Sequence, residues 1–221
     1  MEFYEVVKKR RTTREWQNKD VPLDVIKRII DAGLAAPSNN HLREWEFVVL
    51  HDPEEKDNAL GLVKAWTAEH GLSDPDRLFP VGTIQQRMYK YAMPRQYSML
   101  RSAPYVIIPL FKANRLNCEY VNQLNAFASI WCVVENIFLA ATAEGLGYSM
   151  RIPVGTEGES VCKALGVPGD YMMPCYIGIG YPAEGAPSIE QHAYTADQKI
   201  HVTPPPSWHR GQPNSCMGWV C

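Results

Sequence analysis

The chain has 221 residues, of which 46% are hydrophobic and 21% are charged, a composition typical of a folded globular protein and not of a disordered one. Its formal net charge of −2 argues against nucleic acid and acidic membrane surfaces as partners. The longest apolar run is interrupted by Glu135 and Asn136, so no transmembrane segment is predicted. The N-terminus has no apolar signal core, and a cytoplasmic protein is therefore expected.

The cysteines give no metal signature. The sequence has six of them, with no C-x-x-C pair and no Cys/His cluster at the spacing of a zinc site, so no metal is expected. Most stand singly among apolar residues, where a reduced cysteine behaves as a small hydrophobe. Cys216 and Cys221 form a loose pair in the tail; a redox role and an idle tail both remain open for them.

In chain order, residues 2–10 predict a short helix that leads into the basic stretch 10–16, RRTTREW. Residues 21–37 predict an amphipathic helix with Pro22 near its start and Pro37 at its end. One face of that helix carries Ile26, Ile29, Ile30, Gly33 and Leu34. A strand is expected at 44–50, helical structure at 54–70, and a long Pro-interrupted stretch rich in Met, Tyr and Arg at 71–103. The apolar segment 103–111 predicts a strand in the middle of a sheet.

Residues 122–144 form the strongest predicted helix and are apolar over most of its circumference, so the helix should be central. A stripe of small and polar residues runs along one side: Asn122, Asn125, Ser129, Cys132, Asn136 and Ala140. The stripe could receive a partner helix or face a polar ligand, and close packing is the simpler interpretation. A strand at 145–153, a short helix at 161–168 and a strand at 173–182 follow. From Ala183 the chain is expected to be extended.

Strands separated by helices indicate a layered α/β or α+β domain. The sequence has neither a Rossmann fingerprint nor a phosphate-loop signature. We expect one domain over 1–221, with a lid-like insertion at about 71–103 and an extended C-terminal tail at about 186–221. Such a tail either lies free or wraps along a partner.

Four segments, in this order along the chain, resemble the FMN-dependent nitroreductase family, whose superfamily includes the iodotyrosine deiodinases. The segments are KKRRTTREW (8–16), residues 21–50, LAATAEGLGYSMRIP (139–153) and residues 164–184. The resemblance implies an α+β fold, a three-layer α/β/α sandwich with a mixed, mostly antiparallel sheet around a long central helix. It also implies a homodimer with FMN at the subunit interface, and NADH or NADPH as co-substrate.

The family's basic opening segment resembles Arg10, Arg11, Thr12 and Arg14. By that resemblance these side chains bind the FMN phosphate, the ribityl chain and the pyrimidine edge of the flavin. Guanidinium groups suit a phosphate because they bind it in a bidentate manner. A cation at the position of Arg14 would stabilise negative charge on the reduced ring.

Residues 37–45, PSNNHLREW, resemble a second motif of the family. It implies that Pro37, Ser38, Asn39 and His41 contact the flavin of the other subunit. His41, Arg43 and Glu44 depart from the common pattern, so Arg43 is a candidate substrate contact. Iodotyrosine deiodinases also carry His at that place, but their Glu-Tyr-Lys lid is not evident in residues 71–103.

The third motif, EGLGYSMRIP, implies that Ile152 and Pro153 lie beside the flavin N5, with Ile152 as the amide donor because proline has no N–H. Arg151 is expected to face either the substrate or solvent. A C-terminal basic residue returns to the phosphate in the family, and Arg210 is favoured for this role over Lys199. No catalytic side chain is assigned, because the flavin carries the chemistry.

Together these residues predict an FMN-dependent oxidoreductase that passes a hydride from NAD(P)H through flavin to a small electron-poor acceptor. Nitroaromatics, quinones, activated alkenes and halogenated aromatics all fit that description. The alternative is a flavin-binding sensor or flavin-handling protein without reductase activity. A flat aromatic ligand would suit Met88, Tyr89, Tyr91, Met93 and Tyr97 of the insertion, although ordinary packing explains these residues equally well.

Overall fold

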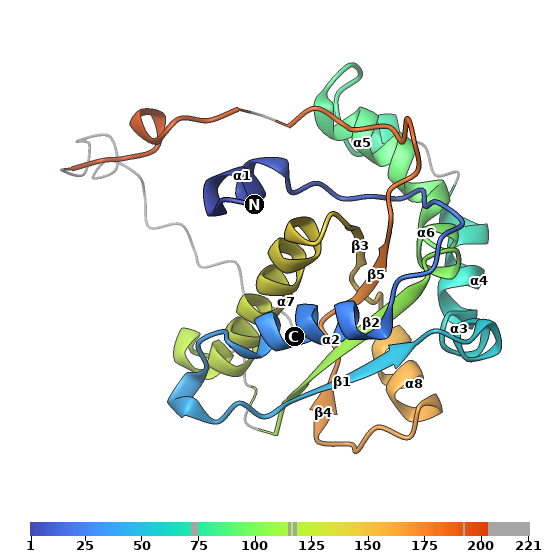
Figure 1. Cartoon of the computed structure of the whole chain (residues 1–221), viewed down its shortest axis with the longest axis vertical. Helices are drawn as coiled ribbons and strands as arrows, with labels where there is room; N and C mark the ends of the chain where they lie inside the picture. Colours follow the sequence, from blue (N-terminus) through green and yellow to red (C-terminus); the bar gives the residue numbers. More distant parts are fainter. Residues whose placement is uncertain (72–74, 115, 117–118, 192, 203–221) are drawn as a thin grey trace.

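The computed structural model describes residues 1–71, 75–114, 116, 119–191 and 193–202. Within these residues a five-stranded sheet has the strand order β1-β2-β5-β3, and β4 also pairs with β2. Every strand pair is antiparallel, and helices cover both faces of the sheet (Figure 1). The strands are β1 (Trp45–Leu50), β2 (Tyr105–Lys112), β3 (Gly147–Arg151), β4 (Tyr171–Met172) and β5 (Tyr176–Gly180). The predicted α+β sandwich is confirmed.

The helices follow the predicted order. They are α1 (Phe3–Lys9), α2 (Leu23–Leu34), α3 (Pro53–Ala59), α4 (Gly61–His70), α5 (Ile84–Ala92), α6 (Ser98–Arg101), α7 (Asn125–Ala143) and α8 (Glu157–Ala164), with 3₁₀ turns η1 (Asn39–His41), η2 (Pro75–Arg77), η3 (Met93–Arg95), η4 (Val121–Leu124) and η5 (Ala196–Gln198). The helical region expected at 54–70 is two helices, because the backbone at Leu60 leaves helical geometry (φ −100°, ψ 6°). Between α4 and β2, the described residues 75–103 hold η2, α5, η3 and α6; we call this stretch the lid segment.

Strand β2 divides the core in two because its side chains alternate between the faces of the sheet. Tyr105, Ile107 and Phe111 pack in the cluster that contains α2 and α7. Val106, Ile108 and Leu110 pack in the opposite cluster, with α3, α4, α6 and α8. The sequence of β2 is therefore apolar throughout because both of its faces are covered.

Pro109 lies inside this central strand, where a proline removes a ladder hydrogen bond. The pairing explains why it is tolerated. Strand β5 pairs with β2 over residues 105–107, and β4 pairs with β2 only at 111–112. Pro109 therefore falls in the gap between the two partners on that side, while β1 pairs along the other side.

Helix α7 lies between α2 and the sheet, as a central helix should. By length and composition the segment Val121–Ala143 could cross a membrane, but Ile130, Val133 and Ile137 are fully buried in the core of this fold. Helix α2 approaches it closely, since a Cβ on Gly33 would lie 2.9 Å from a side-chain carbon of Ile137. Asn136 donates a hydrogen bond to the Ala32 carbonyl, 3.1 Å away. Part of the small and polar stripe thus serves close packing within the chain.

Candidate functional site

The basic segment 10–16 lies against the start of β3 and the end of β5. Thr12 forms a parallel bridge with Tyr148, and Trp16 an antiparallel bridge with Pro182. The Thr13 amide donates to the Tyr148 carbonyl at 2.7 Å. A Cβ on Gly147 would lie 2.3 Å from the Thr13 hydroxyl oxygen, so only glycine allows this close approach. The fold therefore fixes the backbone that carries the predicted arginines.

Arg10 reaches back to two other elements. Its guanidinium donates to the Tyr148 hydroxyl, and its Nε lies 3.3 Å from Oε1 of Glu135 on α7. Burial raises the pKa of Tyr148, an effect that the positive charge of Arg10 opposes. Arg10 is thus held at the junction of α1, α7 and β3 with part of its guanidinium accessible.

Arg11, Thr12 and Arg14 line cavities that the basic segment shares with residues 182–191. Arg11 and Thr12 line one of about 270 Å³, and with Arg14 a smaller one of about 70 Å³. In Figure 1 the chain after β5 runs past both the basic segment and α5. No carboxylate of the described residues lies within ion-pair distance of Arg11 or Arg14. These cationic side chains therefore lack an acidic partner within the described chain.

Arg14 carries the clearest mark of a binding site. Its Nε is buried and makes no hydrogen bond, and burial lowers the pKa of its guanidinium. A buried donor without a partner costs stability and requires an explanation. An acceptor-rich ligand such as the pyrimidine edge of a flavin would supply the missing partner, so this residue fits the group that the sequence predicts.

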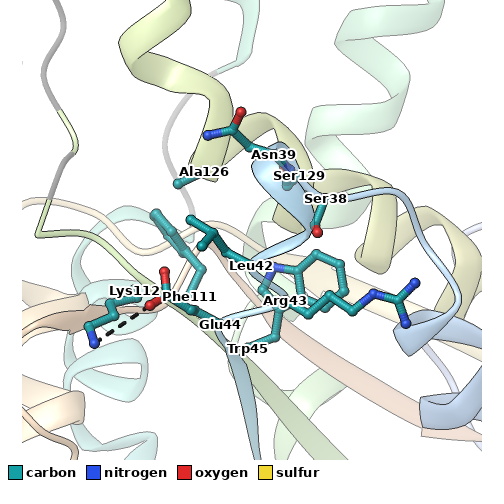
Figure 2. A pocket seen from close by; sticks show the side chains of 10 residues that line it. All are labelled: Ser38, Asn39, Leu42, Arg43, Glu44, Trp45, Phe111, Lys112, Ala126 and Ser129. Carbon is teal, nitrogen blue, oxygen red and sulfur yellow. Dashed lines mark hydrogen bonds and ion pairs between the residues drawn. The ribbon is translucent and has the colours of Figure 1, made fainter.

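The loop from Pro37 to Glu44 lies at the N-terminal end of α7. A small cavity of about 30 Å³ is lined by part of this loop, but Pro37 and His41 are not in its lining; the lining residues are Ser38, Asn39, Leu42, Arg43, Glu44, Trp45, Phe111, Lys112, Ala126 and Ser129 (Figure 2). The Asn39 amide donates to the Ser129 hydroxyl at 3.0 Å, whereas the Ser38 hydroxyl is buried without a partner. The loop thus presents a second orphaned polar group.

The backbone of this loop is strained. Asn40, His41 and Arg43 have φ values of 52°, 55° and 49°, a region that residues other than glycine rarely adopt. Such strain collects at functional sites. His41 and Arg43 are exposed, and in Figure 2 the Arg43 guanidinium points away from the cavity. Neither side chain makes a hydrogen bond or an ion pair with another described residue.

Arg151 corrects the sequence expectation. It faces neither solvent nor an open cavity, because only 3% of its side chain is exposed and it forms an ion pair with Glu157 at 2.7 Å. Ile152, next in the chain, is 55% exposed, and Pro153 is half-buried. Sequence inspection missed this pair because no local pattern signals a partner six residues away across a loop.

A further cluster escaped sequence analysis. Tyr91 and Arg95 of the lid segment both donate to Oε1 of Glu15, at 3.0 and 3.1 Å. The Arg95 guanidinium also stacks 4.2 Å from the centre of the Tyr91 ring. Because Glu15 follows Arg14 directly, the lid segment is fastened to the basic segment. The sequence singled out Tyr91, but no spacing links it to Glu15.

The predicted site residues lie in three places. Arg10, Arg11, Thr12 and Arg14 lie beside the start of β3, and Ile152 and Pro153 follow its end. Pro37, Ser38, Asn39 and His41 lie at the other end of α7. Ser129, beside the loop, and Thr142, beside Thr12, are about 20 Å apart along the helix at 1.5 Å per residue. Arg210 lies outside the described residues. Over the described ranges, no group of three His, Cys, Asp or Glu residues could hold a metal ion.

The chain is similar to known proteins in sequence and in fold. The model of the Nitroreductase family matches residues 7–181. Iodotyrosine deiodinase 1 of Rattus norvegicus is 30% identical over 210 residues, which cover 91% of this chain and 69% of the relative. The iodotyrosine deiodinase of Haliscomenobacter hydrossis is 26% identical over 190 residues, which cover 84% of this chain and 81% of the relative.

Solved structures share the fold. A crystal structure of oxidized iodotyrosine deiodinase bound to FMN and 3-iodo-L-tyrosine has a TM-score of 0.71 at 18% identity, with 91% of this chain and 99% of that chain covered. A variant of an FMN- and NADPH-dependent nitroreductase from Sphigopyxis sp. strain HMH has a TM-score of 0.69 at 20% identity, with 91% and 98% covered. From its sequence match and its sandwich fold, the chain belongs to the Nitroreductase family.

Proposed function

We propose that the protein is an FMN-dependent oxidoreductase that passes a hydride from NADH or NADPH through the flavin to an electron-poor aromatic acceptor. The observation that carries the proposal is the buried, unpartnered Nε of Arg14, beside Arg11, which likewise has no acidic partner among the described side chains. When bound, FMN would accept and donate the hydride. The chain would supply binding, orientation and electrostatics.

The roles of the chain's residues follow from their chemistry. Arg10, Arg11 and Thr12 would bind the phosphate and ribityl hydroxyls through charge-assisted hydrogen bonds. Arg14 would donate to the flavin ring edge and stabilise negative charge there. The Ile152 amide would donate near N5, since Pro153 has no N–H. Arg210 remains the proposed C-terminal phosphate contact.

We also propose a homodimer. The loop 37–41 lies at the far end of α7 from the basic segment, and a second copy would bring its loop to the flavin of the first. The exposed side of α7 includes Ala128 and Cys132, and α1 exposes Phe3 (62%) and Tyr4 (84%). Exposed apolar surface of this kind supports an interface with another protein surface.

The deiodinase relatives support a halogenated aromatic among the acceptors. Their similarity extends over most of this chain, and the lid segment offers aromatic side chains that would suit a flat ring, such as Tyr89, which packs 4.6 Å from Phe79. Nitroaromatics and quinones share the planar, electron-poor character that such a site would favour.

The first test is the flavin itself. We expect the purified protein to be yellow and to release FMN on denaturation; a colourless protein that takes up no FMN contradicts the proposal. Anaerobic NADH or NADPH should then bleach the flavin band within minutes. Bound flavin that neither nucleotide reduces would favour the flavin-sensor alternative. A panel of 3-iodotyrosine, a nitroaromatic and a quinone, each added to reduced enzyme, identifies the acceptor class by the rate of reoxidation.

A further inference from the structure

The short loop between β3 and α8, residues 152–156, is closed by a buried ion pair. Arg151 donates from Nη2 and Nε to the two carboxylate oxygens of Glu157, at 2.7 and 3.2 Å. The two side chains are 3% and 4% exposed. The Glu157 amide also donates to the Val154 carbonyl at 3.1 Å. Both ends of the loop that carries Ile152 and Pro153 are therefore tied to each other.

The same guanidinium reaches the lid segment. Its Nη1 donates to Oε1 of Gln96 at 3.1 Å, and Nε2 of Gln96 donates to the carbonyl of Ala92 at 3.1 Å. Ala92 is the last residue of α5. The guanidinium carbon also lies 4.5 Å from the centre of the Trp66 ring on α4. An unbroken series of polar contacts thus runs from Glu157 through Arg151 and Gln96 to the lid helix.

Stability alone does not account for this arrangement. A buried ion pair is often no more stabilising than apolar residues of the same volume, because both charges lose their water. Here the pair supports a loop whose Ile152 and Val154 side chains are 55% and 48% exposed. The buried ion pair thus fixes the loop backbone, while the apolar side chains of the loop remain exposed. A binding site requires such rigid support for the residues that line it.

We infer that Arg151 is a positioning residue, which holds the Ile152 amide in place through Glu157 and couples this loop to the lid segment through Gln96. The inference rests on the proposed function in assigning the loop to the flavin. The coupling itself is a property of the protein without ligand. A change in the loop is transmitted to α5 because one rigid guanidinium bonds to both Glu157 and Gln96, and Gln96 in turn donates to Ala92 at the end of α5.

The test compares two double variants by hydrogen exchange of the flavin-free full chain. Arg151→Met with Glu157→Leu removes the pair without leaving an unpaired buried charge, which by itself would be strongly destabilising. The matched control is Arg28→Met with Glu144→Leu, because Arg28 and Glu144 form a two-bond pair at 3.0 and 3.1 Å on the surface. We expect roughly tenfold faster exchange in residues 152–156 and 84–97 of the first variant, and no change there in the control.

The single variant Gln96→Leu keeps the ion pair and tests the link to the lid on its own. It should accelerate exchange in 84–97 and leave 152–156 unchanged. Unchanged exchange of the lid segment in both variants, or a uniform rise over the whole chain, would overturn the inference. In the FMN-loaded protein, Arg151→Met with Glu157→Leu should also shift the flavin midpoint potential, relative to the control Arg28→Met with Glu144→Leu. A protein that takes up no FMN would refute the proposed function, while the exchange rates would still decide the coupling.

Discussion

The backbone amide of Asn39 donates a hydrogen bond to the Ser129 hydroxyl, 3.0 Å away, and so fastens the loop between α2 and β1 to α7. Ser129 completes the link by donating to the Asn125 carbonyl at 2.7 Å. Three residues of this loop adopt left-handed backbone conformations, each of which costs about 1 kcal/mol or more. The hydrogen bond to Ser129 is one of the contacts that hold the strained loop in place.

Ser129→Ala should therefore loosen the loop and weaken FMN binding. A fully buried amide without a partner costs about 1–3 kcal/mol; because the Asn39 amide is only part-buried, we expect a loss of about 1 kcal/mol in the free energy of unfolding, measured by urea titration. Ser102→Ala is the control, since its hydroxyl likewise donates to the carbonyl four residues earlier, on Ser98, but lies far from the loop. Equal losses of FMN affinity in both variants would contradict this role.

Arg10→Glu should abolish FMN binding, because it places a carboxylate where the phosphate is proposed to lie and also beside Glu135. Like charges in close contact repel. Flavin content after purification and an FMN titration of the apoprotein measure the effect. Lys27→Glu makes the same charge change at an exposed position of α2 and should retain FMN. Retention of FMN by Arg10→Glu would exclude the phosphate role.

Ala128→Arg should convert the proposed dimer into a monomer. The residue is exposed on α7, and an unpaired charge buried in an apolar interface is strongly unfavourable. Sedimentation at micromolar concentration reports the mass, and flavin content should fall with it because the loop of the second copy is lost. Leu62→Arg, at a 45% exposed apolar residue of α4, should leave both unchanged. A wild-type monomer that binds FMN would refute the dimer.

Stability should fall at alkaline pH partly because of Tyr176. Burial, and then the negative charge of Glu157, raise the pKa of its phenol. The folded chain therefore holds this proton more tightly than the unfolded chain, so the contribution is complete below the unfolded pKa of about 10 and is lost as the pH rises above it. Tyr176→Phe should flatten the loss of urea midpoint between about pH 9 and 11. Tyr120→Phe, at a 60% exposed residue, should not.

Local pattern was sufficient for most of the secondary structure. The spacing of five residues predicted one apolar face of α2. Ile26, Ile29 and Gly33 are buried, Ile30 is partly buried, and Leu34 at the end of the helix is 37% exposed. The unbroken apolar run of β2 predicted a strand covered on both faces, because alternation disappears when neither face meets water. The break at Leu60 was not predicted, although Gly61 follows it directly, because a single glycine is also tolerated inside a helix.

For the proposed FMN site, the sequence predicted less than it did for the secondary structure. The sequence predicted the residues of the proposed FMN site from their order and types, and these assignments remain proposals. It could not show that Arg14 keeps a buried donor without a partner, because burial of a single atom depends on every element packed around it. It could not show that Asn40, His41 and Arg43 share strained backbones either, because neighbouring structure imposes that conformation.

By itself, then, the amino-acid sequence determined the family, the order of the elements and the apolar faces that form the core, since these depend on local periodicity and short motifs. Tertiary structure alone decided the surroundings of Arg151. A guanidinium that could have faced solvent or substrate is buried between Glu157, Gln96 and Trp66. Those three partners come from separate elements, and only the packing of α4, α8 and the lid segment on one face of the sheet brings them together.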